Sequence, residues 1–300
     1  SPARMTTLML LCLGVAVFLQ IAANFANDYS DGIRGTDAHR AAAAVANRVE
    51  YVTRVTGPGD VEREETLDYE ELHAPTRLVA SGVPTRAVLT AAAVNAALAC
   101  ACGLAAVVIT GYWWLLAVGA LCLLAGWFYV GGAHPYGYRG WGEIAAFVFF
   151  GPVATLGTTV TMAGAVEWPT VCASLAIGLV ALAVLSVNNL RDIRSDAQAG
   201  KRTWAVRLGA HATTVCIIVV IALVMLAVLA AGVYVGVHGS TLAHLTAGWG
   251  FCAVLGMVCV LLTGYFTCFE VARGEYMRAM WSLALLALWF ALAFTGFAMV

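Results

Sequence analysis

The sequence predicts an all-α fold, a multi-span transmembrane helical bundle, and composition is the first reason. Hydrophobic residues make up 62% of the 300 residues and charged residues only 11%. A water-soluble domain has about a quarter of its residues charged. The formal net charge is -1, and nucleic-acid binding needs a basic face. The lipid bilayer is therefore an expected partner and a nucleic acid is not.

Long apolar segments are the second reason. The hydrocarbon core of a bilayer is roughly 30 Å thick and takes about 20 apolar residues to cross as a helix. Eight segments meet this requirement, at residues 5–26, 86–109, 112–130, 143–165, 170–188, 211–235, 242–268 and 279–299. They predict eight spans in a single transmembrane domain, residues 1–300. The first run is too long for the apolar part of a signal peptide, so we interpret it as a span whose preceding sequence is missing.

The placement of basic residues is the third reason. The connections at 110–112, 166–169 and 236–241 contain no Lys or Arg, whereas those at 27–85, 131–142, 189–210 and 269–278 carry nearly every one. Of the 16 Lys and Arg, only Arg4 lies at the other face. Basic loops mark the cytoplasmic side, so this face is predicted to be cytoplasmic, in the plasma membrane. The polar stretch 38–74 is predicted to be a cytoplasmic loop insertion.

Cysteine and histidine offer no metal pattern. The nine cysteines lie almost all within apolar runs, and the six histidines are scattered. Neither a disulfide framework nor a zinc site is predicted.

A polar motif follows the first span. In NFANDYSDGIRGTD, residues 24–37, Asn24 and Asp28 are four residues apart, and so are Asn27 and Asp31. On a helix each pair projects from one face. Such oxygen ligands suit Mg²⁺, which takes one or two carboxylates and shares its other positions with water and substrate phosphates. A solvated helix end is the alternative for this motif taken alone.

A second motif of the same kind follows the fifth span. NNLRDIRSDAQAGKRT, residues 188–203, places Asn188 and Asp192, then Asp192 and Asp196, at four-residue spacing. The first and fifth spans enter the membrane in the same direction, so both motifs are predicted on the cytoplasmic face. The repetition indicates an internal duplication of a four-helix unit.

Together the two motifs predict a site for a diphosphate. Two carboxylate clusters can hold two Mg²⁺ ions, which neutralise a departing diphosphate as its carbon–oxygen bond breaks. Lys201 and Arg202 follow the carboxylates of the second motif and are suited to hold the diphosphate. The alternative for the basic residues is that they only set topology, in particular Arg191 and Arg194.

A transporter or channel is the alternative from another class of protein. Transporters place ionisable groups near the bilayer midplane, often on broken helices. Here the carboxylates follow the apolar segments, and charges within those segments are almost absent. The pattern therefore favours an enzyme that acts at the cytoplasmic mouth of the bundle.

Several blocks of the sequence resemble the UbiA-type intramembrane aromatic prenyltransferases. NDYSD and DIRSD are similar to the two Asp-rich signatures of that family. More narrowly, the chain resembles the menaquinone-pathway branch, the 1,4-dihydroxy-2-naphthoate polyprenyltransferases. The blocks that carry this resemblance are NFANDYSDGIRGTD, RLVASG (77–82), GWFYVGGAHPYGYRGWGE (126–143), FVFFGPVATLGT (147–158) and VNNLRDIRSDAQAGKRTWAVRLG (187–209).

The resemblance implies a substrate pair and a ligand set. The donor is a polyprenyl diphosphate and the acceptor 1,4-dihydroxy-2-naphthoate, which with loss of diphosphate and CO₂ give demethylmenaquinone. The residues Asn24, Asp28 and Asp31 would serve one Mg²⁺, and Asn188, Asp192 and Asp196 the other, while Lys201 and Arg202 steady the diphosphate. The family has nine spans, so the resemblance implies that its first span is missing from the eight visible here. Asn27 is a further candidate metal ligand, because it lies four residues before Asp31.

An allylic cation must be kept from water and is stabilised by aromatic faces. We therefore add Tyr136 and Tyr138, which follow the third predicted span, as candidate substrate contacts. Arg139 is a candidate contact of the naphthoate carboxylate or the diphosphate, and Arg77, which opens the RLVASG block, is a further candidate substrate contact. An interfacial aromatic belt is the alternative for the tyrosines. Other acceptors, such as 4-hydroxybenzoate or homogentisate, and an inactive fragment also stay open.

Overall fold

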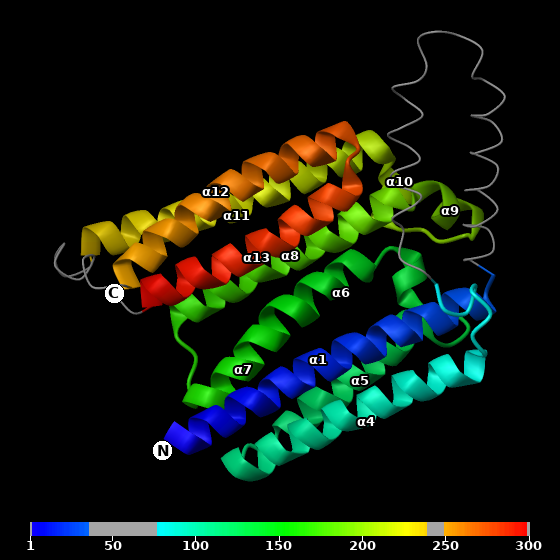
Figure 1. The fold of residues 1–300 in the computed structure, drawn as a ribbon, viewed down its shortest axis with the longest axis horizontal. Helices are drawn as coiled ribbons and strands as arrows, with labels where there is room; N and C mark the ends of the chain where they lie inside the picture. Colours follow the sequence, from blue (N-terminus) through cyan, green and yellow to red (C-terminus); the bar gives the residue numbers. More distant parts are fainter. Residues whose placement is uncertain (1, 36–76, 239–248, 299–300) are drawn as a thin grey trace, which may run out of the picture. The chain divides into compact units, whose positions relative to one another are not determined.

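The computed structural model describes residues 2–35, 77–238 and 249–298, and the regular structure within these ranges is entirely helical (Figure 1). This confirms the predicted all-α fold class. The predicted loop insertion at 38–74 lies outside the described residues.

Seven helical segments are long and apolar enough to cross a membrane. They are α1 (Pro2–Ile33), α4 (Thr85–Thr110), the continuous segment Gly142–Ala163, α8 (Trp168–Arg191), α11 (Ala210–His238), α12 (Trp249–Arg273) and α13 (Tyr276–Ala298). Each overlaps a predicted span, and the first residues of the span predicted at 242–268 lie outside the described residues. The protein is therefore a multi-pass membrane protein.

The predicted span at 112–130 forms a shorter helix than expected. Helix α5 (Leu115–Val130) has 16 residues, about 24 Å at 1.5 Å per residue, which is less than a bilayer core. The residues expected at the start of this span form a turn before α5 instead. Gly111, at a φ of 76°, ends α4 in the left-handed conformation, and its N–H donates to the carbonyl of Val107 at 2.7 Å.

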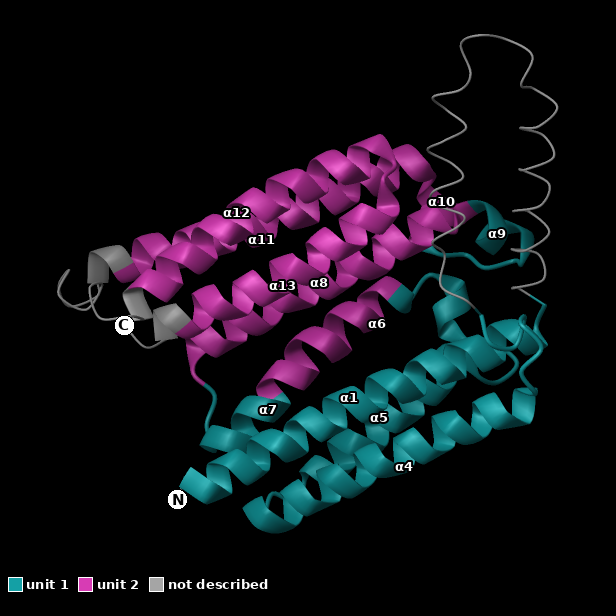
Figure 2. Ribbon diagram, in the orientation of Figure 1, with its two compact units in different colours: residues 1–142, 157–166, 194–203 teal, residues 143–156, 167–193, 204–300 magenta. Residues whose placement is uncertain are grey.

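The described chain forms two compact units, each discontinuous in sequence (Figure 2). The first comprises residues 1–142, 157–166 and 194–203, and the second residues 143–156, 167–193 and 204–300. The prediction of a single domain stays a prediction. In the first unit α1 packs along α4, and a Cβ on Gly14 of α1 would lie 2.8 Å from the sulfur of Cys102 on α4. Small residues at such crossings let helix backbones approach closely.

The second unit packs its helices around α8. Ala183 and Val187 of α8 are fully buried together with Leu283 and Leu286 of α13. The segment α6 (Gly142–Val148), η2 (Phe149–Val153) and α7 (Ala154–Ala163) widens at η2 into a π-turn around Pro152, whose ring cannot donate an ordinary helical hydrogen bond. A Cβ on Gly151 would lie 2.6 Å from a carbonyl oxygen of α8.

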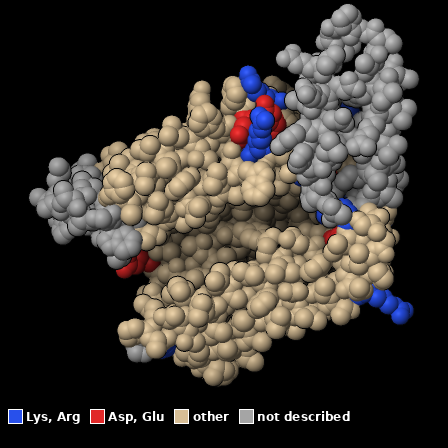
Figure 3. Space-filling model, viewed as in Figure 1, with Lys and Arg blue, Asp and Glu red and all other residues tan. Residues whose placement is uncertain are grey.

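The outer faces of the helices are apolar, as a bilayer requires. Large side chains such as Leu121, 65% exposed, and Trp281, 71% exposed, point away from the packed interior. Figure 3 shows uncharged side chains along most of the face in view, with the charged ones gathered in a few places. Lipid replaces water as the solvent for such a surface.

Candidate active site

The first motif lies on the last turns of α1. This helix has 32 residues, about 48 Å, and so it continues past the roughly 30 Å of a bilayer core. Asp28 and Asp31 are buried at 7% and 6% exposure, whereas Asn24 is exposed and Asn27 half-buried. The expected helical spacing is therefore present, and the carboxylates of the motif are its buried members.

Asp28 is held from one side by the RLVASG block. The backbone N–H of Leu78 donates to Asp28 Oδ2 at 2.9 Å. Gly32 permits this contact, because a Cβ at that position would lie 2.5 Å from Cβ of Val79. The other oxygen, Asp28 Oδ1, is buried and no donor within the described residues reaches it. A buried carboxylate oxygen left in this way is the kind of group that a cation satisfies.

Asp31 lies in a cluster with Lys201, Asp196 and Tyr138. Lys201 Nζ lies 3.0 Å from Asp31 Oδ1 and 3.6 Å from Asp196 Oδ1. The Tyr138 hydroxyl donates to Asp31 Oδ1, and Lys201 Nζ also lies 4.6 Å from the centre of the Tyr138 ring. All four residues belong to the first unit. We call this set the acid–lysine cluster.

A helix C-cap sets Lys201 beside Asp196. Helix α9 (Ile193–Gln198) is followed by Gly200, which takes a φ of 73°. The Lys201 N–H then donates to the carbonyl of Asp196 at 2.9 Å, and the Gly200 N–H to that of Ala197 at 3.2 Å. This is the Schellman arrangement, which glycine adopts without steric penalty. The AQAGK sequence therefore positions Lys201 through the hydrogen bonds at the end of α9.

Electrostatics keep Lys201 charged. Burial alone would lower the pKa of Lys201, but the charges of Asp31 and Asp196, with the hydroxyl of Tyr138, outweigh it and raise the pKa above 10.5. The ammonium group is therefore a permanent cation between two carboxylates at neutral pH.

Tyr138 is placed by the turn that follows α5. It lies in the 3₁₀ turn η1 (Tyr136–Arg139), and its carbonyl accepts the N–H of Arg202 at 2.8 Å. Arg34 packs against its ring with Cζ 5.3 Å from the ring centre, and donates to the carbonyl of Gly132 at 2.8 Å. Arg34 therefore joins the end of α1 to the end of α5, beside the acid–lysine cluster.

The other predicted substrate contacts lie around this turn. Tyr136 is half-buried and packs edge-on against Tyr129, with 5.4 Å between ring centres. The side chains of Arg139 and Arg202 are exposed. The carbonyl of Arg77 accepts the N–H and hydroxyl of Ser81, which closes the turn that holds Leu78 against Asp28.

The second motif is divided between the two units. Helix α8 ends at Arg191, and Asp192, with φ -92° and ψ 10°, breaks it from α9. The expected four-residue spacing of Asp192 and Asp196 therefore does not run along one helix. Asp192 is in the second unit, whereas Asp196 is in the first. Of the two predicted pairs, only Asn188 and Asp192 keep the four-residue spacing along one helix, at the end of α8.

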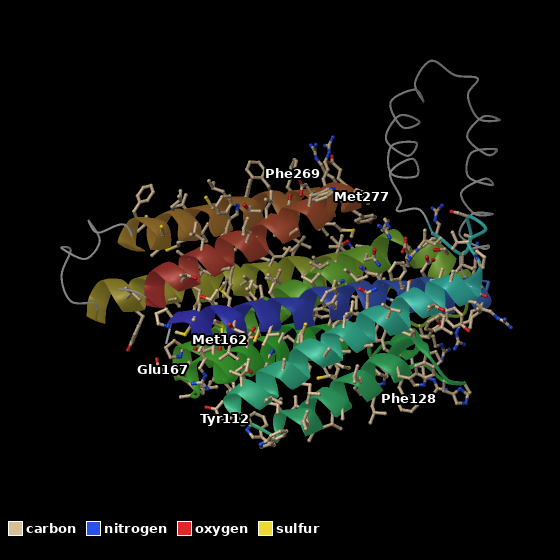
Figure 4. All side chains as sticks on the ribbon, turned by 60° about the horizontal axis from the view of Figure 1, so that its bottom comes forward. Tyr112, Phe128, Met162, Glu167, Phe269 and Met277 are labelled. Atoms are coloured by element: carbon tan, nitrogen blue, oxygen red, sulfur yellow. The ribbon has the colours of Figure 1, made fainter. Side chains whose placement is uncertain are left out.

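Arg191 has a specific role at this pair that its sequence position did not reveal. Its Nε and Nη2 donate to the two oxygens of Asp192 at 2.9 and 3.0 Å, and Nη2 also donates to Asn188 Oδ1 at 2.7 Å. Its Nη1 contacts the sulfur of Met277 at 3.5 Å, at the start of α13 (Figure 4). A fork of this kind fixes a carboxylate in one orientation.

Sequence reasoning also passed over Glu143. It is 1% exposed, and its Oε1 accepts from Asn189 Nδ2 and from the backbone N–H of Trp204, each at 2.9 Å. The available signal was an acidic residue at the start of an otherwise apolar predicted span, a position at which a charge is costly unless it has partners.

The donor set fits Mg²⁺ better than a metal that needs a complete protein cage. Among the described residues no three His, Cys, Asp or Glu gather tightly enough to enclose a metal ion. Mg²⁺ binds through one or two carboxylates and takes its remaining oxygens from water and substrate phosphates. The unsatisfied Asp28 Oδ1, three residues from Asp31 on the same helix, is consistent with that requirement.

The helices and the acid–lysine cluster define a class, multi-pass membrane proteins that bury a carboxylate and lysine site at the end of a span. Residues 1–264 match the model of the UbiA prenyltransferase family, and the chain belongs to this family. Comparison with solved structures found no significant match.

Several relatives from distant bacteria carry one name. The 1,4-dihydroxy-2-naphthoate octaprenyltransferase of Mycobacterium tuberculosis is 46% identical over 67% of this chain and 58% of its own length. The protein of the same name from Escherichia coli is 34% identical over 67% of this chain and 57% of its own. That from Bacillus subtilis is 24% identical over 83% and 68%. The matched part of the chain thus spans less than two thirds of the first two relatives.

Proposed function

We propose that this protein transfers a polyprenyl group from polyprenyl diphosphate to 1,4-dihydroxy-2-naphthoate. The acid–lysine cluster carries the proposal, because a buried lysine between carboxylates, beside the unsatisfied oxygen of Asp28, is suited to a metal-bound diphosphate. The family and the names of the relatives support the reaction class and the acceptor.

Asp28 and Asp31 would hold one Mg²⁺, and Asn188 and Asp192 would hold a second. Prenyltransferases of this family generally depend on a divalent metal. Bound Mg²⁺ would neutralise the diphosphate and so lower the barrier to its departure. Lys201 binds a diphosphate oxygen with its ammonium group, and Asp196 and Tyr138 keep that group in place.

The reaction then proceeds in three bond changes. The allylic carbon–oxygen bond breaks and its electron pair stays on the diphosphate. The naphthoate carbon that bears the carboxylate attacks the allylic cation to form the carbon–carbon bond. The carboxylate leaves as CO₂, and its electron pair restores the aromatic ring, which gives demethylmenaquinone in its reduced form. Tyr138 offers an aromatic face to the cation, and apolar surroundings exclude water.

The site is proposed to open to the cytoplasm, at the plasma membrane. The support is that 15 of the 16 Lys and Arg lie on the predicted face that carries both motifs, or at its boundary. Lys201 and Arg202 belong to this set. The diphosphate group of the donor and the carboxylate of the acceptor are charged, so both groups are expected at the aqueous surface of the membrane, whereas the polyprenyl chain lies in the bilayer.

An acceptor panel tests the assignment. The purified chain in lipid vesicles receives radiolabelled polyprenyl diphosphate, Mg²⁺ and one of three acceptors, 1,4-dihydroxy-2-naphthoate, 4-hydroxybenzoate or homogentisate. We expect labelled product and CO₂ only with the naphthoate. Turnover of either other acceptor at a higher rate would assign a sister reaction, and no turnover with any acceptor would overturn the proposal.

A further inference from the structure

Glu143 is a fully buried carboxylate, and its burial needs a physical reason. It is the second residue of α6, and it ranks among the largest side chains of the described residues that are fully enclosed. Removing a carboxyl group from water is costly unless hydrogen bonds compensate it. Leucine or methionine would fill the same volume without that cost. The position therefore requires an acceptor, and the contacts show for which donors.

One oxygen of Glu143 receives both donors. Asn189 Nδ2 lies 2.9 Å from Oε1, and the backbone nitrogen of Trp204 lies 2.9 Å from the same atom. Asn189 is in the last turn of α8, three residues before Asp192, and Trp204 is the first residue of α10 (Trp204–Leu208). The first N–H groups of a helix have no partner within it, so Glu143 satisfies one of them. All three residues are in the second unit.

These two contacts fix both ends of one segment. Residues 190–203 lie between Asn189 and Trp204, and they carry Asp192 and Lys201. A single carboxylate oxygen thus joins the point where the segment leaves α8 to the point where α10 begins. Fixing the ends of a loop lowers the entropy that its side chains lose when they bind a ligand.

We propose that Glu143 is a positioning residue, which clamps the base of the 190–203 segment and so holds its metal- and diphosphate-binding side chains in register. The catalytic part of this statement rests on the proposed function, whereas the clamp itself does not. Glu143 does not touch substrate in this role. It acts through Asn189 and through the backbone of Trp204.

The chemistry of the clamp predicts which replacement keeps it. Both donors need only an oxygen acceptor, and the amide oxygen of glutamine supplies one. Glu143→Gln therefore retains both hydrogen bonds, whereas Glu143→Leu keeps most of the volume and loses both. Glu270 on α12 offers a matched control, because Oε2 of Glu143 and Oε2 of Glu270 are both buried without a donor among the described residues, yet Glu270 does not flank the segment.

Amide hydrogen exchange in nanodiscs tests the clamp without any assay of activity. In Glu143→Leu we expect exchange of the Trp204 amide, and of peptides within 190–203, to accelerate roughly tenfold or more, because hydrogen bonds to a carboxylate are lost. Glu143→Gln should stay near wild type, and Glu270→Leu should leave these peptides unchanged. An unchanged Trp204 amide in Glu143→Leu, or equal acceleration in α12 and α13, would overturn the proposal.

A second variant covers the case in which Glu143→Leu does not fold. Asn189→Ala removes one of the two contacts, so exchange should rise at residues 190–193 while the Trp204 amide stays protected. Loss of protection at Trp204 in Asn189→Ala would contradict the proposal that Asn189 and Trp204 each donate to Glu143 independently of the other.

Kinetics then connect the clamp to the reaction. In Glu143→Leu the KM for prenyl diphosphate and the Mg²⁺ concentration for half-maximal rate should rise together, and Glu143→Gln should restore both. Altered exchange with normal kinetics would retain the clamp and refute its catalytic part. Absence of activity in every form, wild type included, would refute the proposed function. The clamp would then be decided by the hydrogen-exchange measurement alone.

Discussion

Replacing Lys201 with methionine removes the cation that lies between Asp31 and Asp196. The three side chains are 13%, 9% and 3% exposed, and the nitrogen–oxygen distances are 3.0 and 3.6 Å. Breaking a buried ion pair by deleting one partner costs roughly 3–5 kcal/mol, because the remaining charge is left uncompensated. We expect a loss of this size in the free energy of unfolding of Lys201→Met.

The chain offers a matched control for this substitution. Arg278 and Glu275 form an ion pair at 2.8 Å, but the arginine side chain is 63% exposed. Exposed pairs contribute about 1 kcal/mol or less. Arg278→Met should therefore cost far less than Lys201→Met, although the hydrogen-bond distance is as short.

Equilibrium unfolding in mixed detergent micelles, in EDTA and again in saturating Mg²⁺, measures both variants. A divalent cation can take the place of the ammonium between the carboxylates, so Mg²⁺ should stabilise Lys201→Met more than it stabilises the wild type. Equal losses in Lys201→Met and Arg278→Met would refute the claim that the acid–lysine cluster is a buried electrostatic unit. Equal effects of Mg²⁺ on variant and wild type would refute its role as a cation site.

Two further substitutions test the surroundings of the same cluster. Tyr138→Phe removes the hydroxyl that donates to Asp31 and keeps the ring beside Lys201, so we expect prenyl transfer to fall roughly tenfold or more; an unchanged initial rate would show that this hydrogen bond has no part in the site. Gly32→Ala places a Cβ 2.5 Å from that of Val79 and should destabilise by about 1–3 kcal/mol in the same unfolding assay, whereas Gly126→Ala, with open space around it, should not; equal effects would contradict close packing of the RLVASG block on α1.

Local rules made most of the helical framework predictable. Apolar runs of about 20 residues have no stable alternative to a helix in lipid, and seven of the eight predicted spans are present as such helices. The exception, α5, was missed in length because hydropathy does not register a turn made by apolar residues, here Trp113 and Trp114 after Gly111. The first motif was also predictable, since α1 continues through Asp31.

Contacts between distant parts of the chain were not predictable in the same way. Tyr138 was a candidate on the general ground that aromatic faces stabilise cations, but its bond to Asp31 joins residues 107 positions apart. The break of the helix at Asp192 left no signal, because neither glycine nor proline stands there. Arg191 was assigned only to topology, whereas its guanidinium group orients Asp192. A charge count cannot distinguish these two roles.

Residues 38–74, predicted to be a loop insertion, and the assignment of metal ligands stay predictions. Asn24 and Asn27 illustrate why the second point needs an experiment. Their spacing places them on the helix with Asp28, but Asn24 is exposed and its Oδ1 lies 3.5 Å from the donor Gln20 Nε2. Spacing selects a helix face, whereas burial depends on what packs against that face.

Binding of radiolabelled polyprenyl diphosphate to the wild type and to Asp28→Asn, with Mg²⁺ and with EDTA, tests the central claim most directly. The account predicts Mg²⁺-dependent binding to the wild type that weakens about 100-fold in EDTA or in Asp28→Asn, because a carboxylate that accepts from Leu78 and offers its other oxygen to a cation is lost. Equal binding in EDTA, or by Asp28→Asn in Mg²⁺, would contradict a metal–diphosphate site at the end of α1.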